Sequence, residues 1–135
     1  MTVFTASPAL AHKVRGIVRI VVGYLLLTHA SAKFFGAPHI AYFDNLQLFS
    51  LVGVAGMLEL VGGALLVIGL ATRPVAFVLS GLLAFAYFIG HASKGFFFLP
   101  LMNQGEAAVL FCFILLYLAV AGAGAFSVDA TRNKA

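Results

Sequence analysis

Four long apolar runs, separated by short polar segments, fill most of this chain of 135 residues. Arg19 and Glu59 are the only charges in the interior of these runs. An α-helix rises ~1.5 Å per residue, so ~20 apolar residues cross the ~30 Å hydrocarbon core of a bilayer. The pattern therefore predicts an all-α, transmembrane four-helix bundle in one domain, residues 1–135. The predicted spans cover about residues 14–33, 51–71, 74–92 and 105–122.

The segment between the first two spans, residues 34–50, is too long for a tight turn. Its apolar residues Ile40, Phe43, Leu46 and Phe49 recur at a spacing of three. This spacing places them on one face of a helix, with polar residues between them. We therefore expect a short amphipathic helix that lies in the membrane interface.

Composition supports the membrane assignment. The chain is 63% hydrophobic and only 9% charged, which leaves too little polar material for the surface of a soluble domain. Cys112 is the only cysteine, so neither an intramolecular disulfide nor a two-cysteine relay can form within the chain, and an inert packing role is expected. The first twelve residues contain no Lys or Arg, so we expect no cleavable signal peptide.

Basic residues are distributed unequally between the two ends of the predicted helices. Six lie on the side of the two termini and the second loop, against two on the other side. The six are Lys13, Arg15, Arg19, Arg73, Arg132 and Lys134; the two are Lys33 and Lys94. The positive-inside rule then predicts a multi-pass protein of the cell (inner) membrane with both termini in the cytoplasm. Membrane lipid is an expected partner, whereas nucleic acid is not, because no basic face exists outside the membrane flanks.

Ionisable residues inside the predicted spans gather in the half away from the termini, which we expect to be the outer half. An ionisable group costs ~2.5–3.5 kcal/mol at a helix centre, so it usually faces a partner or a cavity. From the rise per residue, each of the four predicted helices has one or two such residues at a similar depth in the membrane. We therefore expect a ligand-binding pocket here. Its candidate residues are His29, Lys33, Glu59, His91, Asn103 and Glu106.

Glu59 is expected to point into the bundle, because Gly56, Glu59 and Gly63 share one helix face and small residues line helix contacts. By helix rise Lys33 lies ~12 Å above Glu59, so His29 or His91 is the expected hydrogen-bond partner of this carboxyl group. A structural ion pair between Lys33 and Glu59 is the alternative.

Other polar residues also have structural interpretations. Each histidine alone fits a hydrogen-bonded packing role. Arg19 lies near the predicted boundary and is expected to be a structural charge, with its side chain able to reach the interface. Asn103 and Glu106 have the spacing of a capping box, in which the amide and the carboxylate satisfy backbone N–H groups at a helix start.

The chain also contains an ordered set of motifs. Its first part is Arg19-x-x-x-Gly23 followed by His29-x-x-x-Lys33-Phe34-x-Gly36. Glu59-Leu-Val-Gly-Gly and Gly69-Leu-x-Thr-Arg-Pro74 follow, then His91 with Leu99-Pro-Leu-x-Asn103-x-Gly105-Glu106, and finally Gly122-x-Gly124 with Phe126-Ser127-x-Asp129. In this order the motifs resemble the DoxX family, and the likeness covers roughly residues 14–129. It implies a four-helix integral membrane protein. The family takes its name from a small subunit of an archaeal quinol oxidase linked to thiosulfate:quinone oxidoreduction, and bacterial relatives are associated with redox and oxidative-stress partners.

These observations favour an accessory or quinone-handling subunit of a quinol- or thiol-linked redox system, at most a quinone-binding subunit of an oxidoreductase complex. A quinone needs an apolar slot and a few donors near its carbonyl oxygens. His29, His91, Lys33 and Glu59 are the candidate donors. The sequence has no flavin or nucleotide motif, so electrons would come from a partner redox subunit, and a homo-oligomer is the other expected assembly.

Two alternatives remain open. His29 and His91 could ligate haem or a transition metal together with Glu59, although no HxxxH or CxxCH motif is present. A subunit that binds a small solute or lipid, or that acts only as a scaffold, is the third hypothesis, because glycine-lined helices also suit oligomerisation.

Overall fold

The computed structural model describes residues 6–132, and over that range it consists of helices joined by turns and loops, with no strand. Lys134, which contributes to the predicted orientation, lies outside the described residues. The long helices are α1 (Pro8–Phe35), α2 (Leu51–Ile68), α3 (Thr72–Phe85) and α4 (Glu106–Ala121). The helix α3 continues as the π-helix η2 (Ala86–His91) and the 3₁₀ turn η3 (Ala92–Lys94). The remaining elements are the 3₁₀ turn η1 (Ala41–Phe43) and the short helix α5 (Val128–Arg132). The predicted four-helix bundle is confirmed.

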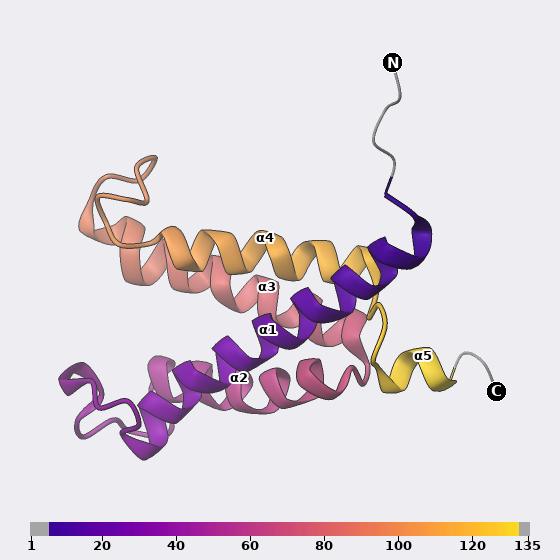
Figure 1. The fold of residues 1–135 in the computed structure, drawn as a ribbon. Coiled ribbons are helices and arrows are strands. Elements are labelled where there is room, and N and C mark those ends of the chain that lie inside the picture. The colour runs from indigo at the N-terminus through magenta and orange to yellow at the C-terminus, as the bar shows by residue number, and fades with distance from the viewer. Residues whose placement is uncertain (1–5, 133–135) are drawn as a thin grey trace.

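The four long helices form two antiparallel pairs, which Figure 1 shows as α1 with α2 and α3 with α4. The start of α1, the α2–α3 turn, the end of α4 and α5 lie together at one end, which we call the terminal end. At the opposite end, the loop end, the connections 36–50 and 95–105 lie apart from each other (Figure 1). The bundle is therefore joined most closely at the terminal end.

The α1–α2 crossing is set by two glycines. A Cβ added at Gly23 would lie 2.8 Å from the carbonyl oxygen of Gly63, and one added at Gly63 would lie 2.9 Å from that of Gly23. Any side chain here would push the backbones apart, so the two glycines allow direct helix contact. Gly62 instead accommodates Leu79 of α3. The predicted face of α2 that contains Gly56, Glu59 and Gly63 does point toward α1.

Local signals explain where the first two helices begin and end. The hydroxyl oxygens of Ser7 and Ser50 accept hydrogen bonds from Leu10 N–H and Gly53 N–H, and so cap α1 and α2. Gly36, with φ of 61°, adopts the left-handed conformation that ends α1. These boundaries follow directly from the sequence.

The amphipathic helix expected in residues 34–50 is only partly present. The segment contains the single 3₁₀ turn η1, followed by turns. Asn45 has φ of 63°, and a right-handed helix cannot continue through a residue in that conformation. The spacing of three among the apolar residues therefore reflects successive turns instead of one helix.

The helices expose large apolar side chains to their surroundings. Examples are Tyr24, Val61, Phe77 and Phe113, one on each long helix, all 60–66% exposed. The helices Leu51–Ile68 and Thr72–Lys94 are long and apolar enough to cross a membrane, and Glu106–Ala121 is a shorter apolar helix. Such surfaces are stable against lipid, and the helices satisfy their own backbone groups as a membrane requires.

Candidate functional site

Lys33 and Glu59 form a buried ion pair between α1 and α2. The Lys33 ammonium donates to Glu59 Oε2, and both side chains are 8% exposed. A Cβ added at Gly56 would lie 3.0 Å from Lys33 Cδ and 2.9 Å from the ring of Phe34, so the lysine stem passes directly over this glycine. The ammonium also lies 5.7 Å from the centre of the Phe43 ring. The pair is closed off from its surroundings on all these sides.

The predicted hydrogen bond from a histidine to Glu59 is therefore wrong, and the alternative, an ion pair with Lys33, is present. The prediction set Lys33 level with Leu51, at the start of α2. In the structure Lys33 contacts α2 at Gly56, only three residues before Glu59. Three residues correspond to a rise of ~4.5 Å, which a lysine side chain spans easily.

A second polar group holds the loop end of the α3–α4 pair together. Asn103 is buried, and its Nδ2 donates to the carbonyl oxygen of Phe96 at 3.2 Å. His91 Nδ1 lies 3.0 Å from the carbonyl oxygen of Asn103, and the hydroxyl of Tyr87 donates to the carbonyl oxygen of Phe97. These contacts fix the loop 95–105 against the end of α3, so they have a structural role.

The capping box predicted for Asn103 and Glu106 is not formed. Gly105 is the N-cap of α4 and no side chain caps it, while Asn103 Oδ1 accepts a hydrogen bond from Gly105 N–H. Gln104 has φ of 59°, which breaks the helical path at the residue directly after Asn103. The helix consequently starts later than the motif predicts, and the Glu106 side chain is left exposed.

His29 is exposed on the surface of α1 and packs edge-on against Phe111 of α4, with 6.1 Å between ring centres. Phe111 belongs to an apolar groove of about 380 Å³ between α1 and α4. Leu25, one helical turn before His29, also lines this groove. All of its lining residues are apolar: Ile17, Val18, Val21, Val22, Leu25, Ala107, Leu110, Phe111 and Ile114. His29 therefore lies at one end of an apolar groove.

The six residues predicted to share one pocket thus separate into different environments. Lys33 and Glu59 belong to the α1–α2 pair, whereas His91 and Asn103 belong to the α3–α4 pair, whose loop end is apart from the first (Figure 1). No hydrogen bond or ring contact joins His29 to His91 within residues 6–132. Over the same residues, no three His, Cys, Asp or Glu side chains are grouped closely enough to hold a metal ion.

Arg19 does not extend toward the interface as expected; it is fully buried, with 0% exposure. Its guanidinium donates to five backbone carbonyl oxygens. Nη1 bonds Leu66 and, at 2.8 Å, Val67, in the last turn of α2. The other acceptors are the carbonyl oxygens of Ala123 at 2.8 Å, Ala125 at 3.1 Å and Phe126 at 2.7 Å. Arg19 is the structural charge that joins α1, α2 and the segment after α4.

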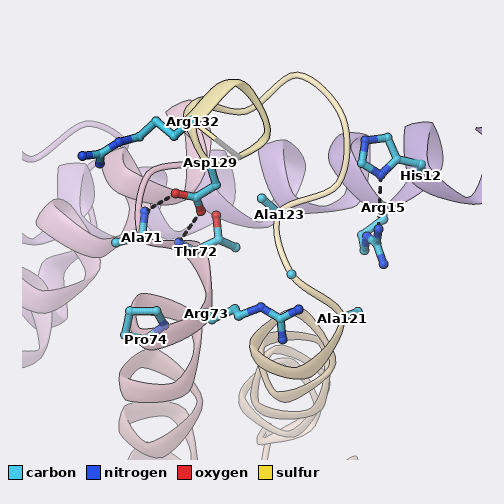
Figure 2. Close-up of a pocket in the computed structure, with 11 residues that line it drawn as sticks. His12, Arg15, Ala71, Thr72, Arg73, Pro74, Ala121, Ala123, Asp129 and Arg132 are labelled. Atoms are coloured by element: carbon cyan, nitrogen blue, oxygen red, sulfur yellow. Dashed lines mark hydrogen bonds between the residues drawn. The ribbon is translucent and has the colours of Figure 1, made fainter. Parts of the chain in front are cut away.

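Two further charges satisfy helix ends at the terminal end. Arg73 Nη1 donates to the carbonyl oxygens of Ala119 and Val120 in the last turn of α4. Asp129 accepts from Ala71 N–H at 2.9 Å and Thr72 N–H at 2.8 Å, at the start of α3 (Figure 2). Cations lie at helix C-termini and a carboxylate at an N-terminus, which matches the sign of each helix dipole.

Sequence reasoning did not identify Arg73 and Asp129 as members of a common unit. Both occur in the motifs that carry the family likeness, Gly69-Leu-x-Thr-Arg-Pro74 and Phe126-Ser127-x-Asp129. A charged residue next to a predicted helix boundary is a signal for capping, but the partner helix is not identifiable from spacing alone.

Asp129 predicts a specific acid sensitivity. Burial by itself raises the pKa of Asp129, but hydrogen bonds from Thr72 and Ala71, with the charge of Arg132, outweigh burial and hold the pKa below its usual value. The carboxylate therefore stabilises the fold above the unfolded-state pKa of ~3.9, and this contribution is lost as pH falls toward the folded-state pKa. Asp129→Asn should lower the melting temperature at neutral pH, and the difference from the unmodified protein should shrink below about pH 4.

The measurement is the melting temperature of detergent-purified protein between acidic and neutral pH. Asp44→Asn is the matched control, because Asp44 is an exposed loop residue whose side chain, within residues 6–132, has a polar contact with His39 alone. A difference between Asp129→Asn and the unmodified protein that stays constant down to the lowest pH would contradict the prediction.

Comparisons with known proteins agree with the motifs. The DoxX family model matches residues 15–92. An uncharacterized protein of Haemophilus influenzae is 43% identical over 114 residues, which cover 83% of this chain and 85% of that protein. No solved structure matches the chain significantly.

Proposed function

We propose, on the premise that this chain belongs to the DoxX family, that it is a membrane subunit of a redox system and holds the ring of a quinone in the groove between α1 and α4. DoxX proteins are membrane proteins associated with redox-linked systems.

The observation that carries the proposal is the groove itself. Its lining is entirely apolar, it opens at the surface of the bundle, and the His29 ring lies next to Phe111 at its end. In a membrane, this surface would face lipid. A quinone consists of an apolar ring and tail with two carbonyl oxygens, so it requires an apolar slot with a single well-placed donor. Histidine can donate a hydrogen bond to one carbonyl oxygen and exchange a proton at neutral pH. His29 is therefore the proposed ligand contact.

Lys33 and Glu59 are not donors in this proposal, because each is already satisfied by the other. Asn103 is not a ligand contact either, because its amide forms hydrogen bonds within its own loop. Electrons would be supplied by a partner redox subunit.

The proposed arrangement in the membrane is multi-pass, in the cell (inner) membrane, with the terminal end in the cytoplasm. Support comes from Arg15, Arg73 and Arg132, which all lie at the terminal end, as the positive-inside rule expects. The groove then opens to the lipid at mid-depth, with His29 on its outer side.

The test is retention of quinone by the purified protein. The protein is extracted in mild detergent, and bound quinone is quantified by solvent extraction and chromatography. Val21→Trp should abolish retention because it fills the groove, and His29→Ala should reduce it because the carbonyl loses its donor. His39→Ala, an exposed histidine in the loop 36–50, should retain quinone like the unmodified protein.

Equal quinone in Val21→Trp and in the unmodified protein would show that the ligand lies elsewhere, and absence of quinone from all preparations would remove the quinone role. In that second case we would propose a scaffolding subunit, because the exposed apolar faces and close helix contacts also suit assembly with other membrane helices.

A further inference from the structure

A cavity of about 480 Å³ opens at the terminal end of the bundle, far along α1 from His29. Four separate segments form it: the start of α1, the α2–α3 turn, the residues after α4, and α5. Its titratable lining residues are His12, Arg15, Arg73, Asp129 and Arg132. Three arginines therefore line a cavity that contains one carboxylate, and we call it the arginine cavity. Arg73 and Arg15 lie on one side of it, whereas the Arg132 side chain points away from both (Figure 2).

Within residues 6–132 the Asp129 carboxylate forms no ion pair with these arginines, although the charge of Arg132 acts on it. Both oxygens of Asp129 accept hydrogen bonds from the backbone amides of Ala71 and Thr72, as Figure 2 shows. Within residues 6–132 the ion pairs are Lys33–Glu59 and His39–Asp44, and neither includes an arginine. The positive charge of the arginine cavity is thus left without a protein anion bound to it.

Several guanidinium donors are also unused. Arg15 Nη2 contacts His12 Nδ1 at 3.2 Å, but Arg15 Nε is buried and has no hydrogen-bond partner in the described part of the chain. Arg73 uses Nη1 for the last carbonyl groups of α4, and its Nε and Nη2 make no such bond. Figure 2 shows Arg73 extending to the end of α4 and Arg15 reaching from α1 toward the same region. A buried N–H without an acceptor is costly, so an acceptor from outside the chain would stabilise it.

We propose that the arginine cavity binds the phosphate group of an anionic ligand. Guanidinium groups present paired N–H donors that match phosphate oxygens, and they bind phosphate more specifically than an ammonium group does. The cavity lies where the helices end, which is the level of lipid headgroups, and basic pockets between membrane helices accommodate anionic headgroups. A lipid phosphodiester and free phosphate share this chemistry. The site is separate from the groove proposed for a quinone.

The experiment measures dissociation constants on delipidated protein in mild non-ionic detergent. The probes are dihexanoyl phosphatidylglycerol, dihexanoyl phosphatidylcholine and inorganic phosphate. The double variant Arg15→Gln/Arg132→Gln removes two cations of the cavity but leaves Arg19 and Arg73 at the helix ends. It should weaken binding of phosphatidylglycerol about tenfold, equivalent to ~1.4 kcal/mol.

Lys13→Gln is the matched control, because Lys13 lies on the same exposed stretch of α1 but does not line the cavity, and it should leave the dissociation constant unchanged. Binding of phosphatidylglycerol that inorganic phosphate displaces assigns the site to any phosphate, whereas binding that phosphate leaves intact assigns it to the lipid. If the double variant is poorly folded, Arg15→Gln alone provides the comparison, since Arg15 donates to no backbone carbonyl group in residues 6–132 and its buried Nε is the unpaired donor. Equal affinity of the unmodified protein and the arginine variants, or equal affinity for phosphatidylcholine and phosphatidylglycerol, would overturn the proposal.

Discussion

Replacement of Arg19 by lysine is expected to be among the most destabilising single changes in this protein. The guanidinium donates to five carbonyl oxygens with no exposure to solvent, whereas an ammonium offers three donors from one nitrogen atom. At least two carbonyl groups would lose their partner, and hydrogen bonds to a charged group contribute ~1.5–3 kcal/mol each. The expected loss is therefore ~3–6 kcal/mol.

A loss of that size is a large fraction of the ~5–15 kcal/mol by which proteins are usually stable, so Arg19→Lys should melt at a much lower temperature or fail to accumulate. The measurement is the melting temperature in detergent, with expression level as a second readout. Arg15→Lys, one turn earlier on the same helix, is the control and should cost little, because Arg15 donates to no backbone carbonyl group in residues 6–132. Equal melting temperatures for the two variants would refute the structural role of Arg19.

Glu59→Gln is expected to have the second large effect. The substitution leaves the Lys33 ammonium buried at 8% exposure without its counter-charge. Removing one partner of a buried ion pair typically costs ~3–5 kcal/mol, whereas replacing both partners by apolar residues of similar size is often neutral. The double variant Lys33→Met/Glu59→Leu should therefore recover most of the stability that Glu59→Gln loses.

The matched control is the exposed pair His39–Asp44, whose side chains are 67% and 54% exposed. Asp44→Asn should change stability by less than about 1 kcal/mol, because exposed pairs contribute little. The measurement is the melting temperature, in one detergent, of the unmodified protein, Glu59→Gln, Lys33→Met/Glu59→Leu and Asp44→Asn. A double variant that is no more stable than Glu59→Gln would mean that the charges themselves, and not only their mutual compensation, hold α1 to α2.

Much of the fold could be predicted because the relevant signals are local. The apolar runs located all four helices, and the spacing of Gly56, Glu59 and Gly63 identified the face of α2 that contacts α1. The candidate site was predicted less well. Helix rise placed His29, Glu59 and His91 at similar depth, but depth does not say whether two helices are adjacent, and the α1–α2 and α3–α4 pairs diverge at the loop end.

The same limit explains the specific errors. The Lys33–Glu59 distance depends on how far α2 extends past the end of α1, which the spacing of residues within either helix does not give. The capping box failed because Gln104 adopts a left-handed conformation that the surrounding loop imposes.

The sequence by itself determined that this is an all-helical membrane protein of the DoxX family, because hydropathy, helix periodicity and ordered motifs are properties of short segments. Only the tertiary structure decided which polar groups meet. Arg19 binds the carbonyl oxygen of a residue 104 positions away, and Arg73 and Asp129 satisfy the ends of helices other than their own. Such pairings depend on the axial offset and crossing of helices, which result from packing over the whole bundle and are not encoded in the spacing of any one segment.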